Sequence, residues 1–353
     1  YMVEFYFTLA SNTIWAERGH EVAWAQFAVR EALPAPVPTL KYSPVETSPG
    51  YFKDSLEVDG DEFSVSFEEL SGVIDDWIVN DIPMFEFGPV ANFWRAPTDN
   101  DNGGGSSGTN AQWRSAKLDM AKQKLISLEE AKPDGENTGA RRLIAQTRVA
   151  GPVVKYGMNC TFDWTVHPNG DLELVFSGAP YGEWKIDTVP RIGVQFKLPA
   201  MHDRVQWYGL GPGESYSDTK AGSRIGRWAS DVDALFFDYV KPQENGNRTD
   251  TRWVTFTDSR GQGFIVTADK KFDFSASRYS QQNLSEAKHP FDLEIEDDIT
   301  VNLDLAQNGI GSHSCGPGVL PQYHLKPEPF AIKFRFRPIR LDSQNPMMVA
   351  RRN

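Results

Sequence analysis

The stretch YGMNCTFDWTVHPNGDLELVF, residues 156–176, predicts two antiparallel strands joined by a tight turn. Its first half places apolar side chains at every second position, namely Tyr156, Met158, Cys160, Phe162, Trp164 and Val166. After the turn at 167–170 the alternation resumes with Leu172, Leu174 and Phe176. Successive side chains point to opposite faces of a strand, so this period predicts a hairpin with one buried face.

The same period recurs along most of the chain. It appears at Phe63, Val65 and Phe67, at Ile192, Val194, Phe196 and Leu198, at Val301, Leu303 and Leu305, and at Ile332, Phe334 and Phe336. One helix is predicted, over about 111–124 with Thr109 or Asn110 as its cap. No alternation of strands with helices is visible, so a (β/α)₈ barrel is not encoded. The sequence therefore predicts an all-β protein whose antiparallel sheets pack face to face.

The two ends of the chain differ from this central region. Residues 1–31 contain two strand patterns around a turn at Arg18–Gly19–His20, and residues 32–50 contain five prolines. We expect a small β unit at 1–31, a stiff linker at 32–50, a main domain at 51–338 and a tail at 339–353. A hairpin is marginal alone. We therefore expect something to cover its apolar face. Because the sequence opens in mid-strand without an initiator Met, we also expect the chain to be a piece of something longer.

Composition excludes several classes of function. The chain of 353 residues has 40% hydrophobic and 24% charged residues and a formal net charge of −12, which disfavours nucleic acid and anionic membranes as partners. No apolar run is long enough to cross a membrane. Two cysteines, Cys160 and Cys315, make neither a disulfide framework nor a zinc motif. Their use fits a reducing compartment, and we expect a cytoplasmic protein.

The segment FWRAPTDNDNGGGSSGTNAQWR, residues 93–114, contains the most unusual loop. Phe93 and Trp94 are predicted to be buried anchors, and the Gly and Ser residues at 103–108 predict a mobile loop. The Asx residues at 99–102 suggest calcium, but Asn110 stands where an EF-hand loop needs Glu. A functional loop and a flexible surface connection both remain open.

Three further polar stretches, 207–227, 238–252 and 307–327, combine glycine, proline and charge. The charged residues Glu214, Asp218, Arg227, Glu244 and Arg248 are predicted to form a structural polar network with at least one ion pair between two loops. A sugar pocket with aromatic walls is the alternative. His313 is interpreted as a loop histidine or as part of a site wall. No serine-hydrolase, zinc-protease or phosphate-loop motif is present, and no metal site is predicted.

Five motifs in order carry a resemblance to a known family. They are FWRAPTDND (93–101), YGLGPGESYSD (208–218), PQENGNRTDTR (242–252), SRYSQQNL (277–284) and NGIGSHSCGPGVLPQY (308–323). Together they resemble the C-terminal domain of β-galactosidases of glycoside hydrolase family 2. AERGHEVAWAQF (16–27) resembles the last strands of the immunoglobulin-like domain that precedes it there.

The resemblance implies a large antiparallel supersandwich of the galactose-mutarotase type, with a short immunoglobulin-like remnant before it. It implies that this chain holds no catalytic residue. The acid/base and nucleophile glutamates of that family belong to an upstream barrel and act by retaining hydrolysis of β-galactosides such as lactose. It also implies no cofactor in this chain, Mg and Na in the catalytic domain, a homo-oligomer, and as partners a galactoside and the catalytic barrel or large chain.

The resemblance further implies that two loops approach the substrate. The first carries Asp99, Asn100 and Asp101 and continues from Gly103, and the second carries His313 and Cys315. The best-studied bacterial relatives have a tryptophan at the position of Cys315, and a cysteine cannot offer an indole's stacking face. The alternative is a free-standing carbohydrate-binding domain or a mutarotase-like enzyme, which would need a histidine acid and a carboxylate base on one sheet face.

Overall fold

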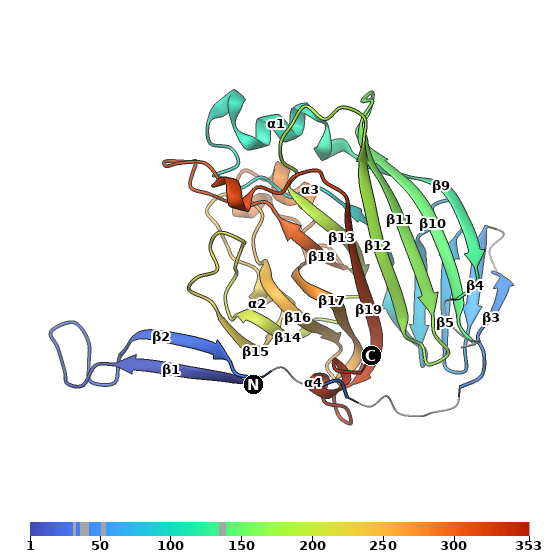
Figure 1. Ribbon diagram of the computed structural model, residues 1–353, viewed down its shortest axis with the longest axis horizontal. Helices are drawn as coiled ribbons and strands as arrows, with labels where there is room; N and C mark the ends of the chain where they lie inside the picture. The colour runs from blue at the N-terminus through green and yellow to red at the C-terminus, as the bar shows by residue number, and fades with distance from the viewer. Residues whose placement is uncertain (31–32, 36–41, 51–53, 134–138, 353) are drawn as a thin grey trace. The chain divides into compact units, whose positions relative to one another are not determined.

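The computed structural model describes residues 1–30, 33–35, 42–50, 54–133 and 139–352, and it divides into two compact units (Figure 1). The smaller unit combines Tyr1–Thr39 with Met347–Asn353, and the larger unit is Leu40–Pro346. No helix among the described residues is both long and apolar enough to cross a membrane.

The smaller unit contains an antiparallel hairpin. Strand β1 (Met2–Thr8) pairs with β2 (Glu21–Ala28), as the alternation of residues 3–9 predicts. The described residues leave the apolar face of this hairpin uncovered, since Phe5, Phe7 and Phe27 are each at least half exposed. The C-terminal residues complete the unit, because the Ala35 amide donates to the carbonyl of Arg351 at 2.8 Å. The segment predicted as a tail thus ends inside this unit, after the short helix α4 (Pro346–Val349).

The larger unit is built on a 12-stranded antiparallel sheet. One path through it runs β15 (Arg224–Asp231), β14 (Arg204–Gly211), β16 (Arg248–Thr257), β17 (Gln262–Ser277), β19 (Phe330–Arg340), β12 (Leu172–Tyr181), β11 (Gly157–Val166), β10 (Arg141–Ala150) and β9 (Lys122–Ala131). Three strands branch from that path, namely β18 (Ile299–Gln307), β13 (Arg191–Leu198) and β8 (Phe87–Asn92). The stretch 156–176 becomes β11, a turn and β12, so the predicted hairpin is confirmed.

A second, five-stranded sheet belongs to the same unit. Its order is β3 (Glu46–Pro49), β4 (Ser55–Asp59), β5 (Phe63–Glu68), β6 (Ile74–Val79) and β7 (Ile82–Phe85). Strand β3 lies within 32–50, so the end of the predicted linker is a paired strand instead. Thr47 and Ser48 form this strand without the apolar alternation that would identify it in the sequence, because it is an edge strand with half-buried side chains.

Aromatic side chains join the two sheets into one core. In Figure 1 the five-stranded sheet lies behind β10–β12, and the ring of Phe67 in β5 meets Trp164 in β11 at 6.3 Å. Phe85 at the end of β7 contacts three phenylalanines of the large sheet, Phe196, Phe264 and Phe336, at 5.1, 5.6 and 5.5 Å. The prediction of an all-β fold with antiparallel sheets packed face to face is confirmed.

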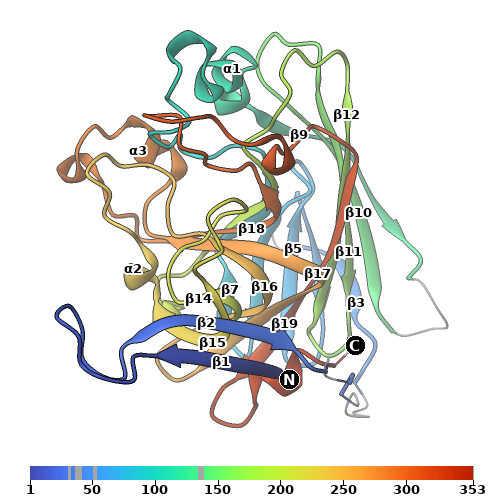
Figure 2. The same ribbon diagram turned by 60° about the vertical axis from the view of Figure 1, so that its left-hand side comes forward.

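Helices are short and lie in the connections. Besides α4 they are α1 (Thr109–Ser115), α2 (Val232–Leu235) and α3 (Gln281–Glu286), with 3₁₀ turns at 105–107, 118–120, 290–292 and 321–323. The predicted helix over 111–124 was too long. Lys117 has a positive φ of 59°, which ends the helix, and β9 begins at Lys122. Figure 2 shows α1 and α3 at the same end of the larger unit.

Candidate functional site

Sheet topology brings two distant loops, 99–108 and 308–320, to one end of the larger unit. Strands β8 and β18 both pair antiparallel with β13, and Gly193 of β13 is the register partner of Asn92 in one strand and of Asp304 in the other. The two strands therefore run in the same direction and end at the same edge of the sheet. Each loop begins shortly after its strand ends, so the loops start side by side.

Asn100 connects the two loops directly. Its Nδ2 donates to the carbonyl of Gly311 at 2.8 Å, and its Oδ1 accepts from the amide and the hydroxyl of Ser314 at 3.1 and 2.7 Å. The backbones also approach closely at Gly103, where a Cβ atom would lie 2.2 Å from the carbonyl oxygen of His313. Only glycine fits this approach without a shift of one loop.

The buried side chain of Arg95 binds both loops. Its Nε and Nη2 bind the two oxygens of Asp101 at 3.1 and 2.7 Å. Its Nη1 donates to the carbonyl of Asn308 at 2.6 Å, and its Nη2 donates to that of Gly309 at 3.1 Å. Two-point contacts of this kind fix the plane of a guanidinium group and therefore the register of the loops around it.

Two other predicted segments buttress the loops. The carboxylate of Asp218 accepts from the amides of Ile310 and Gly311 at 3.0 and 2.7 Å. The amide side chain of Gln243 accepts from the backbone of Asp99 at 2.9 Å and donates to its carboxylate at 3.1 Å. The motifs at 93–101, 208–218, 242–252 and 308–323 therefore converge on one site.

The residues predicted to form the rim differ in what they can offer a ligand. Asp99 and Cys315 are exposed, whereas Asn100, Gly103 and His313 are half-buried. The thiol of Cys315 thus faces outward instead of packing as a small core residue. Asp101 is 2% exposed and both of its carboxylate oxygens bind Arg95. Phe93 is 4% exposed, as predicted, while Trp94 is half-buried beside Trp113.

The predicted ion pair within the polar network is wrong, since none of its five members forms an ion pair with another. Glu214 instead accepts from the amide of Gly246 at 2.7 Å and from the hydroxyl of Tyr239. Arg248 donates to backbone carbonyls, including that of Leu235 at 3.0 Å.

Two of the remaining members differ in their surroundings. Glu244 pairs with Arg191 at 2.8 Å, and Arg227 is exposed. In these loops, carboxylates and guanidinium groups form hydrogen bonds with backbone N–H and C=O groups that lie outside the sheets. The sequence alone did not indicate this use of the charged side chains.

Two carboxyl groups, the buried Asp304 and the half-buried Asp273, lie next to the site on adjacent strands. They are direct register partners across β17 and β18. Burial raises the pKa of Asp273 to about 8, and the neighbouring carboxylate of Asp304 adds to this shift. Burial likewise raises the pKa of Asp304 to about 7, while Arg191, whose Nε lies 3.6 Å away, opposes that rise. The two carboxyl groups therefore titrate as a pair, and each has a raised pKa.

Sequence reasoning missed Arg95, Arg191, Gln243 and Asp304 as parts of this site. Arg95 lies within the motif FWRAPTDND, so its place next to the loop was visible in the sequence. Arg191 and Asp304 sit in strands whose alternation shows only their apolar neighbours. Among the described residues, no group of three or more His, Cys, Asp or Glu is placed to hold a metal ion.

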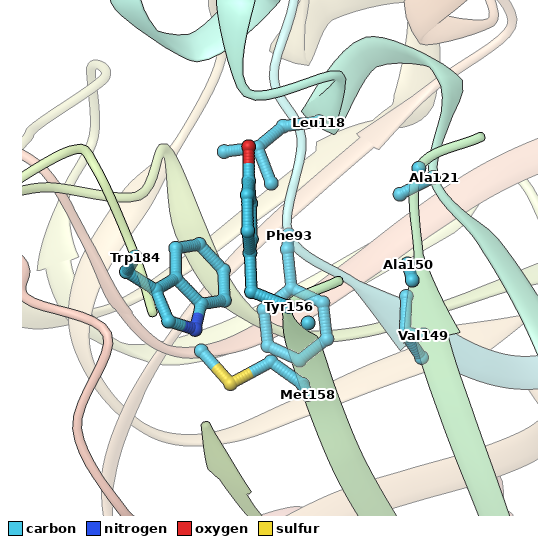
Figure 3. Close-up of a pocket in the computed structure, with 10 residues that line it drawn as sticks. Phe93, Leu118, Ala121, Val149, Ala150, Tyr156, Met158 and Trp184 are labelled. Carbon is cyan, nitrogen blue, oxygen red and sulfur yellow. The ribbon is translucent and has the colours of Figure 1, made fainter. Parts of the chain in front are cut away.

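An apolar pocket lies near the end of β8 and the start of β9, where Phe93 and Ala121 line it (Figure 3). Its lining residues are Phe93, Leu118, Ala121, Val149, Ala150, Gly151, Tyr156, Gly157, Met158 and Trp184. The rings of Tyr156 and Trp184 meet at 5.3 Å, and the Tyr156 hydroxyl donates to the carbonyl of Ala116 at 3.3 Å. No charged side chain lines this pocket, so the convergent polar loops are the better candidate for a functional site.

Comparison with known sequences gives two family matches. Residues 59–337 match the beta galactosidase small chain family, and residues 1–30 match domain 4 of beta-galactosidase. The β-galactosidase of Kluyveromyces lactis is 32% identical over 320 residues, which cover 90% of this chain and 30% of that protein. That of Halalkalibacterium halodurans is 30% identical over 332 residues, covering 92% of this chain and 31% of that protein. The chain thus spans about a third of the length of these relatives.

Comparison with solved structures gives more distant likenesses. A galactose 1-epimerase from Lactobacillus acidophilus aligns over 86% of this chain and 99% of its own chain, with 11% identity and a TM-score of 0.43. A likeness of this size carries no argument about the site.

Proposed function

The chain belongs to the beta galactosidase small chain family, and on that premise we propose that it is the non-catalytic part of a β-galactosidase. In this proposal it buttresses the catalytic barrel and lends the loops 99–108 and 308–320 to the rim of the active site. The whole protein hydrolyses terminal β-galactosides with retention, using two carboxylates that lie outside this chain.

The convergence of four sequence motifs on one end of the larger unit carries this proposal. Arg95, Asp218 and Gln243 all bind backbone or carboxylate atoms of the two loops. Side chains whose hydrogen bonds fix the position of a loop are expected where the function depends on that position. The exposed Asp99 and Cys315 are then the groups available to a sugar or to the barrel.

The open face of the hairpin supports a place in a larger protein. Val3, Phe5, Phe7 and Phe27 are between 41% and 57% exposed, and they lie on one face of β1 and β2. Apolar side chains gathered on one face of a two-stranded sheet need a partner layer for stability. In the proposed whole protein, other strands of an immunoglobulin-like domain supply that layer.

The test compares the chain alone with the whole protein. We expect no turnover of a chromogenic β-galactoside by the purified chain, and turnover when the catalytic part is joined to it or added. Activity of the chain alone, above a blank purified in the same way, would contradict the proposal. Variants Glu214→Gln and Glu244→Gln would then show whether that activity depends on carboxylates of this chain.

A further inference from the structure

Beneath the two loops lies a group of polar side chains that are almost completely closed off from solvent. We call Arg191, Tyr216, Asp304 and Gln307 the internal polar cluster. Their exposed fractions are 0%, 3%, 0% and 3%. Arg191 begins β13, Asp304 and Gln307 end β18, and Tyr216 lies in the connection between β14 and β15.

Some atoms of the internal polar cluster are paired within the protein. Nη2 of Arg191 donates to Glu244 at 2.8 Å, and Nε2 of Gln307 donates to Oδ1 of Asn247 at 2.9 Å and to Oδ2 of Asp304 at 3.3 Å. Nε of Arg191 lies 3.6 Å from the same Asp304 oxygen, which is too long for a hydrogen bond.

Five atoms of the cluster have no hydrogen-bond partner in the part of the chain that the structure describes. They are Nε and Nη1 of Arg191, Oη of Tyr216, Oδ1 of Asp304 and Oε1 of Gln307. Buried polar atoms without partners are rare in native proteins because each gives up its hydration without compensation. Several such atoms in one place, some donors and some acceptors, call for a shared partner.

We propose that the internal polar cluster encloses one or more ordered water molecules, held by Nη1 of Arg191, Oη of Tyr216 and Oδ1 of Asp304. Water is the ligand that both accepts from a guanidinium group and donates to a carboxylate, and buried waters commonly make about three hydrogen bonds. The positive charge of Arg191 disfavours the binding of a metal cation at this place. The carboxylates of Asp304 and Glu244 disfavour the binding of an anion. A sugar is too large for a cluster so fully enclosed.

The surroundings of the cluster keep the hydroxyl of Tyr216 protonated, as a hydrogen bond donated to the water requires. Burial, together with the carboxylates of Glu244 and Glu214, raises the pKa of Tyr216 well above its usual value of 10.0, so its hydroxyl stays neutral and able to donate. The water would link the ends of β13 and β18 to the segment that carries Asp218. Because Asp218 binds loop 308–320, the internal water helps to fix this loop.

A crystal structure of the native protein that contains this chain, at a resolution that shows ordered solvent, tests the site directly. We expect a water oxygen at about 2.7–3.2 Å from both Nη1 of Arg191 and Oδ1 of Asp304. A dry cluster, in which Arg191 turns to bind Asp304 directly, would overturn the proposal. Density for a solute other than water would also overturn it.

The variant Tyr216→Phe tests the same site in solution by the sign of its effect on the melting temperature of that protein. If the hydroxyl binds a buried water, its removal lowers the melting temperature, by roughly 1–3 °C. If the site is dry, the hydroxyl is an unpaired buried group, and its removal leaves the melting temperature unchanged or raises it. The second result would overturn the proposal.

The control is Tyr208→Phe in β14. Tyr208 is half-buried, and its ring lies under the guanidinium group of Arg252 at 5.1 Å, a contact that phenylalanine keeps. We expect Tyr208→Phe to leave the melting temperature unchanged. A fall equal to that of Tyr216→Phe would show a general effect of losing a hydroxyl and would overturn the assignment of water to the cluster.

Discussion

Arg95 and Asp101 form a two-point ion pair with Nη2 of the arginine 2.7 Å from Oδ1 of the aspartate, and their side chains are 0% and 1% exposed. The aspartate comes from loop 99–108, while the same guanidinium group also donates to the carbonyls of Asn308 and Gly309 in the second segment. One buried side chain thus sets the spacing of two segments that are far apart in the sequence.

Asp101→Asn should strongly destabilise the protein. It leaves the buried charge of Arg95 uncompensated, which costs about 3–5 kcal/mol in the free energy of unfolding. Urea unfolding measures the loss. The matched control is Asp119→Asn, because Asp119 pairs with Arg114 at 2.8 Å but both side chains are partly exposed. That pair should contribute at most about 1 kcal/mol. Equal losses for the two variants would contradict a special role for Arg95.

Asn100→Ala should release loop 308–320 with little effect on overall stability. The change removes the acceptor of the Ser314 amide and the donor to Gly311. Hydrogen exchange at Ser314 should quicken by roughly 2–10-fold, the effect of losing one hydrogen bond. Asn102→Ala is the control, since Asn102 bonds to Thr98 and Asn110 within its own segment. Unchanged exchange at Ser314 would show that Asn100 does not restrain the second loop.

The Asp273 and Asp304 pair should make stability fall as the pH rises. Folding raises the pKa values of these acids from 3.8 to about 8 and about 7, so the native state binds more protons than the unfolded state between those limits. The contribution of the two protonated acids to the free energy of unfolding is fully present below pH 3.8. It is lost as the pH rises through about 8. Asp273→Asn should make the decrease of the free energy of unfolding with rising pH less steep. Urea unfolding at several pH values measures it.

Asp187→Asn is the control for this pH dependence, because Asp187 is an exposed residue in the connection between β12 and β13. We expect it to leave the slope of stability against pH unchanged. If Asp273→Asn has the same slope as the unmodified protein, then the two carboxyl groups are not protonated as a pair.

Cys315→Trp should alter how the whole protein binds the leaving-group sugar. The thiol is exposed, so a larger side chain meets no core and should leave the melting temperature unchanged. If loop 308–320 lies at the proposed rim, an indole adds a stacking contact of ~0.5–1.5 kcal/mol, or roughly twofold to tenfold in acceptor affinity. Hydrolysis of a glycosyl-enzyme intermediate should change little, because the leaving group has already departed. Unchanged acceptor affinity would argue against the rim position.

The fold class and most of the strands follow from local patterns in the sequence. Alternation of apolar residues is a local property, and a strand with one buried face must show it wherever it lies, as residues 157–166 and 172–176 do. The order of five motifs determined the family. Local signals failed at β3, an edge strand without alternation, and at the end of α1, where the positive φ of Lys117 stops the helix.

Which residues of the site meet depends on the packing of the strands in three dimensions. The pairing of β8 and β18 with the same strand β13 brings loops 99–108 and 308–320 together, and no periodicity in the sequence records that choice of neighbour. It also decided the role of each charge. Asp101 was predicted at the rim and is buried beneath it, while Glu244 pairs with Arg191 instead of with a neighbouring loop. Ion pairs depend on distance and burial in space, and these arise only after the sheets have packed.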